Sequence, residues 1–480
     1  MATRTETIDQ TGGRGHSRAE ATEPVPADAA PMVAEASPEV AHAVPDARDG
    51  ASGGILQSFQ HYPVFRLLIA GSLLSSSAFW MYQVAVGWLA LELTDSAMFV
   101  GLAGFAGGIP MLVLSIPAGV IIDRYDRRTV LLVAQTVVML VSAVFAALVW
   151  FDLIHPWSML LLVTLYGTVM SFNFPTRAAM VAAIVRRDDL ANAVALNAAT
   201  QNATRVIGPS LAGVLIALTG TAETFILAAV FQLLALLTTR AMPSMAATAS
   251  LAAAIDTTAD APAAARKPKG WEALTVGVRI VAGSPYLTGL IVLSLAPTIF
   301  VMPYINLMPV FARDVLGLGS TGLGVLLAAA GLGTVGGALS VARAGRMQMM
   351  PGIQLLMALA FTVGVIGFAL SRSLWLALPL LFLAGWASAA FLAINQTAVQ
   401  MSVDDDIRGR VLSVSLLIWG MLPIGQLAVG ALAGRIGTPP ALVFSCILSL
   451  LSIVLIAQRY PWLRRTMAEE ERVVVVSTIR

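Results

Sequence analysis

The sequence predicts an all-α membrane protein whose twelve transmembrane helices form two pseudo-symmetric bundles of six. Three observations support this fold class: an apolar composition, twelve apolar runs, and a match between the two halves of the chain. Of the 480 residues, 58% are hydrophobic and 12% are charged, whereas a soluble domain carries about 25% charged residues. A water-exposed surface needs more polar side chains than this composition supplies, so we expect the surface to face lipid.

The apolar runs have the length that a membrane crossing requires. A helix spans the hydrocarbon of a bilayer with about 20 residues, and its backbone groups must pair within the helix because lipid offers them no partner. We therefore expect each run to form a helix, and we number the runs as spans one to twelve. They begin near Phe65, Met98, Thr129, Trp157, Leu190, Ala222, Tyr286, Thr321, Ile353, Leu374, Val411 and Pro440.

The basic residues alternate between the loops, and short loops rich in Arg and Lys remain on the cytoplasmic side of a bacterial membrane. The loops after spans two, four, six, eight and ten carry Arg124, Arg127, Arg128, Arg186, Arg187, Arg240, Arg266, Lys267, Lys269, Arg343, Arg346, Arg408 and Arg410. The opposite loops carry little more than Arg313, Arg372 and Arg435. The sequence therefore predicts a multi-pass protein of the bacterial cytoplasmic (inner) membrane with both termini in the cytoplasm.

Charge and cysteine content narrow the range of partners. The formal net charge is +2, and the basic residues occur in short groups between apolar runs. We therefore expect the lipid bilayer, and not nucleic acid, to be a partner. The chain has one cysteine, Cys446, and four scattered histidines, so the sequence predicts no intrachain disulfide, no metal site and no cofactor.

Composition divides the chain into five segments. Residues 1–52 are rich in Ala, Pro, Glu and Asp and predict a disordered cytoplasmic tail. Residues 53–241 and 285–460 hold the two six-helix halves, and residues 461–480 form a second cytoplasmic tail. The segment 242–284 reads as a cytoplasmic linker, whose end carries Trp271, Leu274, Val278 and Val281 at helical spacing. This spacing predicts an amphipathic helix on the inner membrane surface.

The two halves match at a constant offset of 217 positions. The matched pairs are Gly119 with Gly336, Phe174 with Phe391, Asp189 with Asp406, Val194 with Val411, Gly208 with Gly425, and Gly213 with Gly430. Six matches at one offset indicate a duplicated unit. Parallel halves of this kind are a transporter design that places the substrate path between them, so we expect a small-molecule substrate there.

Span five carries a polar stripe. Asn197, Gln201 and Arg205 recur at intervals of four, which places their side chains on one face of the helix. Arg205 lies about 22 Å from the start of the span at 1.5 Å per residue, well inside the bilayer. A charge at that depth costs at least about 2.5 kcal/mol. Arg205 should therefore face a wet cavity, or, as the alternative, be a structural arginine bonded to backbone carbonyls.

Polar and aromatic residues of other spans are candidates for the same substrate path. They are Gln83, Asn173, Arg177, Asn306, Asn395, Gln396, Trp419 and Gln426, with Trp80 as a further aromatic wall. For each amide the alternative is a hydrogen bond that joins neighbouring helices, and for each tryptophan it is packing. No Asp or Glu lies near the centre of any span. An unpaired Arg205 fits an anionic or carbonyl-rich substrate better than a cationic drug.

The loop after span two has a recognisable pattern. Gly119-Val-Ile-Ile-Asp123-Arg124-Tyr-Asp126-Arg127-Arg128 resembles the signature of the major facilitator superfamily, with Asp126 where a glycine is usual. Gly119 permits close helix approach. The resemblance implies a conformational latch between the halves, formed by Gly119, Asp123, Arg124, Arg127 and Arg128. The alternative is a topology anchor only.

Further segments narrow the resemblance to one branch. Val86-Gly87-Trp88-Leu89, Glu92 to Ser96, Phe174 to Arg177, Arg205 to Gly213, and Arg408 to Val411 are similar to the enterobactin-exporter-like, or transmembrane secretion effector, branch. The likeness runs from about Ile55 to Tyr460. Gly208, Pro209 and Gly213 also resemble the antiporter signature of drug exporters, which implies a helix hinge; plain helix packing is the alternative.

The resemblance implies a secondary active transporter that exports a drug-like, siderophore-like or other small metabolite by alternating access, with protons as the coupling ion. The sequence contains no phosphate-binding loop of the Gly-x-x-x-x-Gly-Lys-Ser/Thr type, so ATP hydrolysis is not expected. A membrane hydrolase would need a nucleophile with a base in reach, and the spans offer no such base. The alternatives that stay open are a non-transporting sensor or assembly component, and an importer of the same fold.

Overall fold

The computed structural model describes residues 57–185, 189–243, 271–344, 351–403 and 405–464. The chain clusters into two units, Met1–Pro45 and Asp46–Arg480, and all described residues belong to the second. The predicted tail 1–52, most of the linker 242–284, and the tail 461–480 beyond Arg464 lie outside the described residues. So do the loop residues Arg186, Arg187, Arg266, Lys267, Lys269 and Arg346, and the side chains of Asp123 and Arg408.

The first half is a run of long helices joined by short turns. A short helix, α2 (Gln57–His61), precedes six long ones. These are α3 (Pro63–Thr94), α4 (Ala97–Arg124), α5 (Arg127–Trp150), α6 (Pro156–Ile184), α7 (Leu190–Leu218) and α8 (Thr221–Arg240). They correspond to predicted spans one to six.

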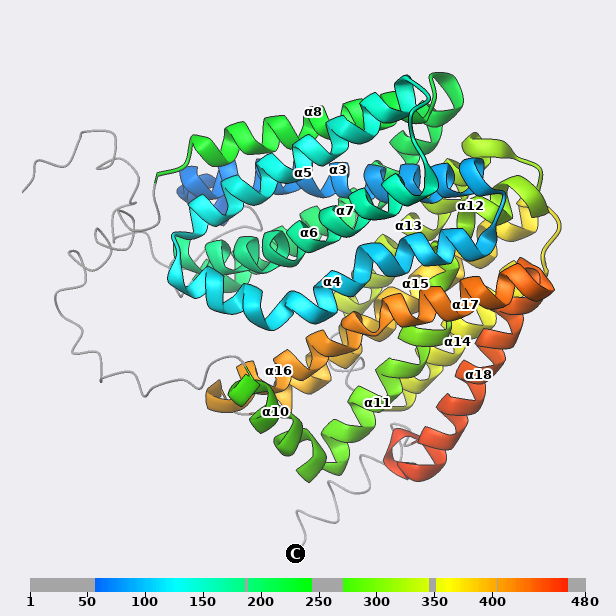
Figure 1. Cartoon of the computed structure of the whole chain (residues 1–480). Coiled ribbons are helices and arrows are strands. Elements are labelled where there is room, and N and C mark those ends of the chain that lie inside the picture. Colours follow the sequence, from blue (N-terminus) through cyan, green and yellow to red (C-terminus); the bar gives the residue numbers. More distant parts are fainter. Residues whose placement is uncertain (1–56, 186–188, 244–270, 345–350, 404, 465–480) are drawn as a thin grey trace, which may run out of the picture. The chain divides into compact units, whose positions relative to one another are not determined.

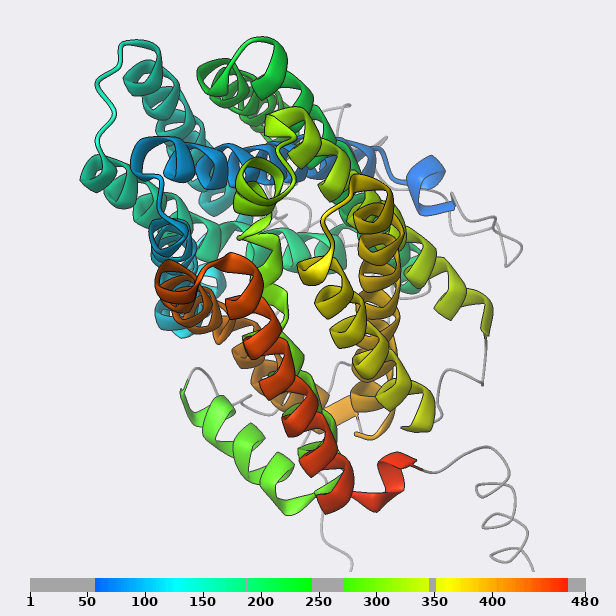
Figure 2. The ribbon, with the colours of Figure 1, turned by 90° about the vertical axis from the view of Figure 1, so that its right-hand side faces the viewer.

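The second half is assembled from more pieces. It contains α10 (Trp271–Gly283), α11 (Pro285–Phe300), the 3-10 turn η2 (Met302–Ile305), α12 (Met308–Val310), the π-helical turn η3 (Phe311–Val315), α13 (Gly319–Ala344), α14 (Pro351–Leu370), α15 (Leu374–Met401), α16 (Asp405–Gly420), α17 (Leu422–Ile436), α18 (Thr438–Arg459) and the 3-10 turn η5 (Pro461–Arg464). Figures 1 and 2 show the first half lying mostly above the second in both views.

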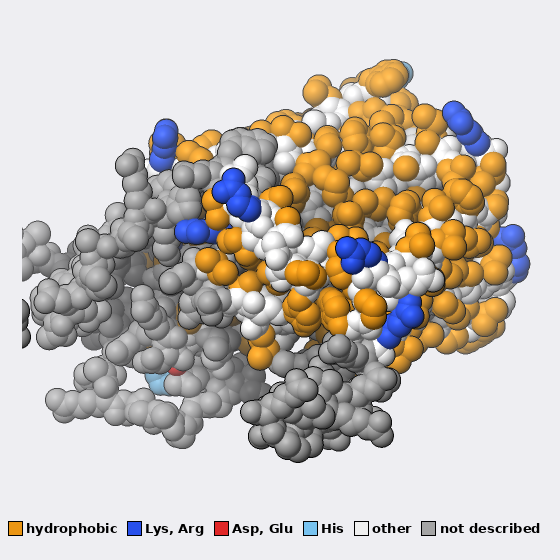
Figure 3. Space-filling model, turned by 90° about the horizontal axis from the view of Figure 1, so that it is seen from below, with side chains coloured by type: hydrophobic (Ala, Val, Ile, Leu, Met, Phe, Trp, Pro, Cys, Tyr) orange, Lys and Arg blue, Asp and Glu red, His pale blue; other side chains and the backbone are white. Residues whose placement is uncertain are grey.

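The prediction of twelve spans is confirmed, although α7 differs from the others. Eleven helical segments of the described chain are long and apolar enough to cross a membrane. The twelfth, α7, has 29 residues but is less apolar, because it carries the polar stripe with Arg205. Figure 3 shows a face of the bundle on which hydrophobic side chains predominate, as a lipid-facing surface requires.

The sequence predicts a single helix for each of spans seven and eleven, but the structure shows that both are broken. Span seven breaks after Phe300 into α11, η2, α12 and η3, and span eleven breaks at Met421 between α16 and α17. Proline lacks a backbone N–H and its ring clashes with the preceding turn. Pro303 and Pro309 lie in the first break, and Pro423 follows the second.

The repeat of the sequence is visible in the helix boundaries. Helix α6 ends at Ile184 and α15 ends at Met401, while α8 begins at Thr221 and α18 begins at Thr438. Both pairs of residues are separated by the offset of 217 found in the sequence. The offset of 217 positions therefore relates the ends of helices in the two halves as well as the matched residues.

Helix α10 is the helix that the linker pattern predicted. It packs against α16 and α11, with Val281 buried and Val278 exposed. The side chains of Trp271 and Leu274 lie outside the described residues. Its apolar side is thus partly covered by the second half.

Among the described residues, the two most extensive helix crossings between the halves are α4 against α17 and α7 against α13, and smaller contacts join α4 to α16 and α3 to α12. Both extensive crossings rely on glycine. A Cβ atom on Gly101 of α4 would lie 2.7 Å from the Cα of Gly430 on α17, and one on Gly213 of α7 would lie 2.6 Å from the backbone nitrogen of Gly324 on α13. Small residues let helix backbones approach this closely in a membrane.

Polar contacts between the halves lie at the end of the bundle where α3 ends, which we call the Asp95 end; the opposite end, where α4 stops, is the Arg124 end. Asn306 donates from Nδ2 to the carbonyl oxygen of Val100 at 3.0 Å. Arg313 pairs with Asp95 at 2.9 Å and donates to the carbonyl oxygen of Leu91 at 3.3 Å. The hydrogen bond that Arg313 donates to the Asp314 carboxylate, then the charge of Asp314, and then the contact with Asp95 raise the pKa of Arg313, so this guanidinium stays charged.

The Arg313–Asp95 ion pair contributes little to closing this end. The Asp95 side chain is 81% exposed, and an exposed pair contributes about 0–1 kcal/mol. An added methyl group in a tight contact costs about 1–3 kcal/mol.

We expect Gly101→Ala to lower the thermal unfolding midpoint of the purified protein in detergent, because the new Cβ would overlap α17. Gly119→Ala is the matched control: a Cβ there meets nothing within 4 Å, and alanine favours the helix. Equal midpoints for the two variants would contradict a tight crossing at Gly101.

Candidate functional site

A cavity of about 320 Å³ lies between the halves at the middle of the bundle. Its wall in the first half comes from α3, α4, α6 and α7, and in the second half from Asn306 and the junction of α16 with α17. The polar and aromatic lining residues are Ser76, Phe79, Trp80, Tyr82, Gln83, Tyr166, Phe174, Gln201, Thr204, Arg205, Asn306, Trp419 and Gln426. Six of the eleven predicted path residues are among them.

Arg205 is the charged residue of this wall. It is half-buried, and its Cζ lies 5.7 Å from the ring centroid of Trp80 on α3. Within the described part of the chain its guanidinium makes no hydrogen bond and no ion pair. Of the two readings of Arg205, the structure favours the cavity over a structural arginine bonded to backbone carbonyls.

The rest of the polar stripe extends along α7. Gln201 is exposed and lines the cavity together with Thr204. Asn197 is half-buried and lies outside the lining, two turns from Arg205 towards the Arg124 end. The stripe therefore reaches the cavity only with its second and third members.

Asn306 and Gln426 lie on the wall nearest the Asp95 end. The Asn306 amide both lines the cavity and bonds to Val100 across the halves. Gly104 of α4 makes room for both amides, because a Cβ there would overlap the Asn306 side chain and lie 2.8 Å from Oε1 of Gln426. Trp419 is half-buried near the end of α16, and Gln83 is exposed on α3.

Asn173 and Arg177 do not line the cavity, contrary to our prediction. Both are buried on α6, where Arg177 donates from Nε to Oδ1 of Asn173 at 3.1 Å and from Nη1 to Oγ of Ser72 at 3.1 Å. These bonds join α6 to α3 within the first half. Arg177 Nη2 and Asn173 Nδ2 have no partner among the described residues.

Asn395 and Gln396 are also outside the cavity. Asn395 is buried and donates from Nδ2 to the carbonyl oxygen of Leu290 at 2.9 Å, which joins α15 to α11. Gln396 is exposed on α15 and is not part of the lining. For Asn395 the alternative of an amide that joins two helices describes the structure.

Sequence reasoning missed the aromatic wall and the glycines that face it. Tyr82 of α3 and Tyr166 of α6 stack with ring centroids 3.6 Å apart, and Phe79 meets Phe174 edge-on at 5.3 Å. Gly104 and Gly108 of α4 lie one turn apart on the cavity wall. The glycine spacing in span two was the available signal.

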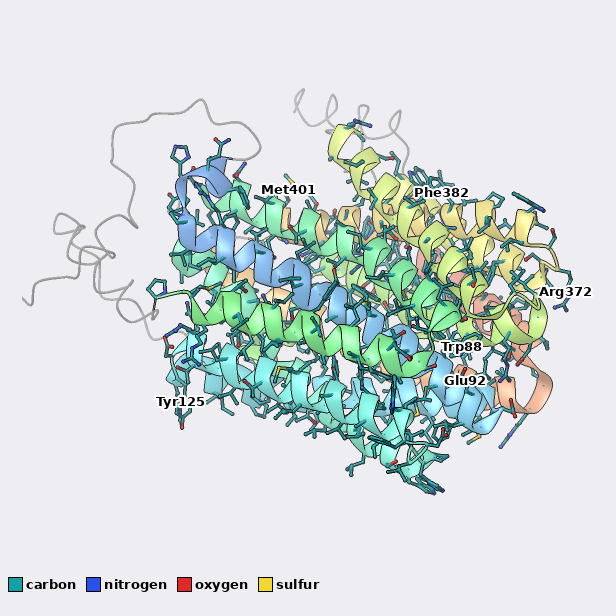
Figure 4. The ribbon with its side chains drawn as sticks, turned by 90° about the horizontal axis from the view of Figure 1, so that it is seen from above. Trp88, Glu92, Tyr125, Arg372, Phe382 and Met401 are labelled. Carbon is teal, nitrogen blue, oxygen red and sulfur yellow. The ribbon has the colours of Figure 1, made fainter. Side chains whose placement is uncertain are left out.

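The acidic residues lie away from the cavity. Glu92 is exposed near the Asp95 end, where Trp88 donates from Nε1 to Oε1 of Glu92 at 2.5 Å and Thr221 donates to Oε2 at 3.1 Å (Figure 4). Among the described residues, the lining contains no Asp or Glu.

The described contacts of the expected latch remain in the first half. Arg127 donates to the carbonyl oxygen of Ala179 on α6 at 3.2 Å, and Arg128 donates to the carbonyl oxygens of Thr239 and Arg240 at 3.3 and 2.7 Å. Cations are favourable at such helix C-termini. Arg124 is exposed.

Two further residues of this loop differ from the expectation. Gly119 has open space around it and makes no close helix approach in this conformation. Asp126, where a glycine is usual, caps α5 by accepting from the backbone N–H of Thr129 at 3.0 Å. An N-cap carboxylate satisfies a donor that the helix leaves unpaired.

The expected hinge residues pack closely. Helix α7 runs without a break through Gly208, Pro209 and Gly213. A Cβ on Gly208 would lie 2.6 Å from Cβ of Trp80 and 2.9 Å from the carbonyl oxygen of Ser77. Gly208 therefore packs against α3 and Gly213 against α13, as the packing alternative describes.

Residues 57–473 match the family model described as transmembrane secretion effector, a branch of the major facilitator superfamily. The chain belongs to this family. It is similar to the staphyloferrin A transporter of Staphylococcus aureus, with 23% identity over 367 residues that cover 75% of this chain and 86% of the relative. It is also similar to the enterobactin exporter EntS of Shigella flexneri, with 27% identity over 387 residues that cover 80% of this chain and 87% of the relative.

Solved structures agree on the fold. A bacterial homologue of the human lysosomal transporter Spinster superposes with a TM-score of 0.63 at 16% identity, covering 84% of this chain and 99% of that one. The fold is that of the major facilitator superfamily, as the signature predicted. The family to which the chain belongs consists of transporters and not of enzymes, also as predicted.

The two intramembrane arginines should respond differently to substitution. We expect Arg177→Met to lower the free energy of unfolding by about 1–3 kcal/mol, because Asn173 and Ser72 lose a buried partner. Arg205→Met should lower it less, since only the cation–π contact with Trp80 is lost and no described hydrogen bond. Thermal unfolding of the two purified variants beside the wild type measures this; equal destabilisation would contradict the assignment of Arg177 to packing and Arg205 to the cavity.

Proposed function

We propose that this protein is a secondary active transporter that exports a small molecule from the bacterial cytoplasm by alternating access. The observation that carries the proposal is the cavity between the halves, with an unpaired guanidinium, four amides and an aromatic wall. A concave, largely apolar site with a few convergent polar groups is the usual form of a small-molecule site. The alternative of a non-transporting sensor or assembly component would gain support if Arg205 and Gln201 were packed against neighbouring helices without a cavity.

We further propose that the protein lies in the inner membrane with the Arg124 end and both termini in the cytoplasm. The support is the excess of arginine in the loops of that end. In this orientation the crossings and polar contacts at the Asp95 end close the cavity to the outside. The conformation is then the one that receives a substrate from the cytoplasm.

Export requires the contacts at the Asp95 end to open. Their strength is modest: the Asn306 hydrogen bond contributes about 0.5–1.5 kcal/mol and the exposed Arg313 pair about 0–1 kcal/mol. A ligand shifts a two-state equilibrium by its difference in affinity for the two states. Differential binding in the cavity must therefore offset these polar contacts together with the packing of the two helix crossings.

The substrate that we propose is siderophore-like, with drug-like compounds and other metabolites as further classes. The support is the staphyloferrin A transporter and the enterobactin exporter among the relatives. The direction, export and not import, has the same support.

We also propose the division of the chain into the five segments that the sequence predicts, from the cytoplasmic tail 1–52 to the cytoplasmic tail 461–480.

The coupling ion that we propose is the proton, in an antiport that the resemblance to drug exporters implies. The described cavity lining offers an arginine, amides and hydroxyls. The proton would therefore bind elsewhere on the chain or on the substrate itself.

Deletion of the gene should raise the intracellular level of at least one small molecule, measured by metabolite profiling of cells and medium. The wild-type gene should restore the level, and Arg205→Ala should not. Arg459→Ala, which changes an exposed arginine outside the cavity, serves as the matched control. An unchanged profile in the deletion strain would defeat the export proposal.

Transport in energised inverted vesicles tests direction and coupling together. Labelled enterobactin and staphyloferrin A should accumulate in vesicles that contain the protein, together with any metabolite found above. An uncoupler should abolish the accumulation. Accumulation that persists after the gradient collapses would rule out proton coupling, and uptake only into right-side-out vesicles would establish import.

A further inference from the structure

We infer that Arg205, held against Trp80, is an anion subsite of the central cavity, and that the transported molecule is an organic anion with an apolar or aromatic part. The inference rests on the proposed transport function and names the chemical class of its substrate. It is argued from the lack of a described partner for Arg205, from its cation–π contact with Trp80, and from the composition of the surrounding wall.

Arg205 is a charge without compensation inside the protein. It is half-buried at the middle of a membrane-spanning bundle, and within the described residues it has neither a carboxylate nor a hydrogen-bond acceptor. Buried charges in proteins are normally paired. The missing partner therefore points to a group that arrives from outside the chain.

The contact with Trp80 leaves the N–H donors of the Arg205 guanidinium free to bind a ligand. The Cζ atom lies 5.7 Å from the Trp80 ring centroid, so the contact is of the cation–π kind. A cation–π contact uses none of the N–H donors of the guanidinium, and no described residue accepts a hydrogen bond from them. A planar carboxylate can accept two parallel hydrogen bonds from the edge of a guanidinium.

The comparison with Arg177 supports a specific role for Arg205. Both arginines lie within spanning helices of the first half. Arg177 donates to Asn173 and Ser72, within the packed core. The chain thus supplies acceptors for the arginine that joins helices and none, among the described residues, for the arginine in the cavity.

The wall around Arg205 suits the rest of an organic anion. Gln83 and Gln201 carry amides that can donate to further oxygen atoms or accept from hydroxyls. Phe79, Phe174 and Trp419 offer aromatic surface to an apolar part. A cavity of about 320 Å³ accommodates a small molecule that has both.

Occupancy also has a consequence for the transport cycle. Closing the cavity at both ends removes water from Arg205, and a bare charge in a low dielectric is unfavourable. A bound anion removes that penalty. The anion therefore favours the closed intermediate through which alternating access must pass.

The test uses a pair of probes of nearly equal shape, 2-naphthoate with a carboxylate and 2-naphthamide with a neutral amide in its place, titrated calorimetrically into the purified full chain in detergent. We expect 2-naphthoate to bind at least about tenfold more tightly, because a charge-assisted hydrogen bond is stronger than a neutral one. Arg205→Gln should remove the preference, and Arg205→Lys should keep part of it. Arg459→Gln is the matched control, since Arg459 also stacks on an aromatic ring, that of Tyr460, but outside the cavity.

Each other outcome overturns the subsite. Equal affinity for the two probes, an undiminished preference in Arg205→Gln, or no saturable binding of either probe at millimolar concentration would each do so. A thermal unfolding midpoint equal to the wild type shows that Arg205→Gln is folded. If the anion preference fails while metabolite export persists, the substrate class alone is wrong; if the preference holds without export, the transport proposal fails instead.

Discussion

Inside a bilayer, a polar group has to find its partner within the protein or in enclosed water, and the structure follows from this constraint. Backbone groups satisfy it by forming helices. Buried side chains satisfy it locally, as Arg177 does with Asn173 and Ser72, or Asn395 with the carbonyl oxygen of Leu290. Some buried atoms, Nη2 of Arg177 among them, have no described partner, but the Arg205 guanidinium makes no described hydrogen bond or ion pair at all, and it lines the cavity. The candidate site is thus the place where a charged side chain lies within the bundle without a described partner.

The sequence was sufficient for the fold because hydrophobic length, loop charge and the 217-residue repeat are each encoded by many residues. The breaks in spans seven and eleven were harder, although Pro303 and Pro423 were in view, because prolines inside α4, α6 and α7 leave those helices continuous. Whether a proline interrupts a helix depends on whether neighbouring helices support the turn around it. That information is tertiary.

Prediction of the cavity was partial for a related reason. An amide in a span is apparent from the sequence, but the direction in which it points depends on how its helix is rotated. Asn306 and Asn395 look alike in the sequence, yet the first lines the cavity and the second joins α15 to α11. Arg205 was identifiable because a charge at that depth has few alternatives. The signature loop was recognisable too, but its arginines bind the ends of α6 and α8 in their own half, a contact that no motif specifies.

The contact of Gly101 with Gly430 has a mechanical consequence. Where two helices meet through side chains, relative motion forces those side chains to change rotamer, and the interface resists in steps. At Gly101 and Gly430 backbone lies directly on backbone, while elsewhere in the same crossing Pro423 and Met98 pack against glycines of the partner helix. At the glycine pair the two bundles can therefore tilt against each other with no change of side-chain rotamer, and the free-energy cost there is that of separating the surfaces and admitting water.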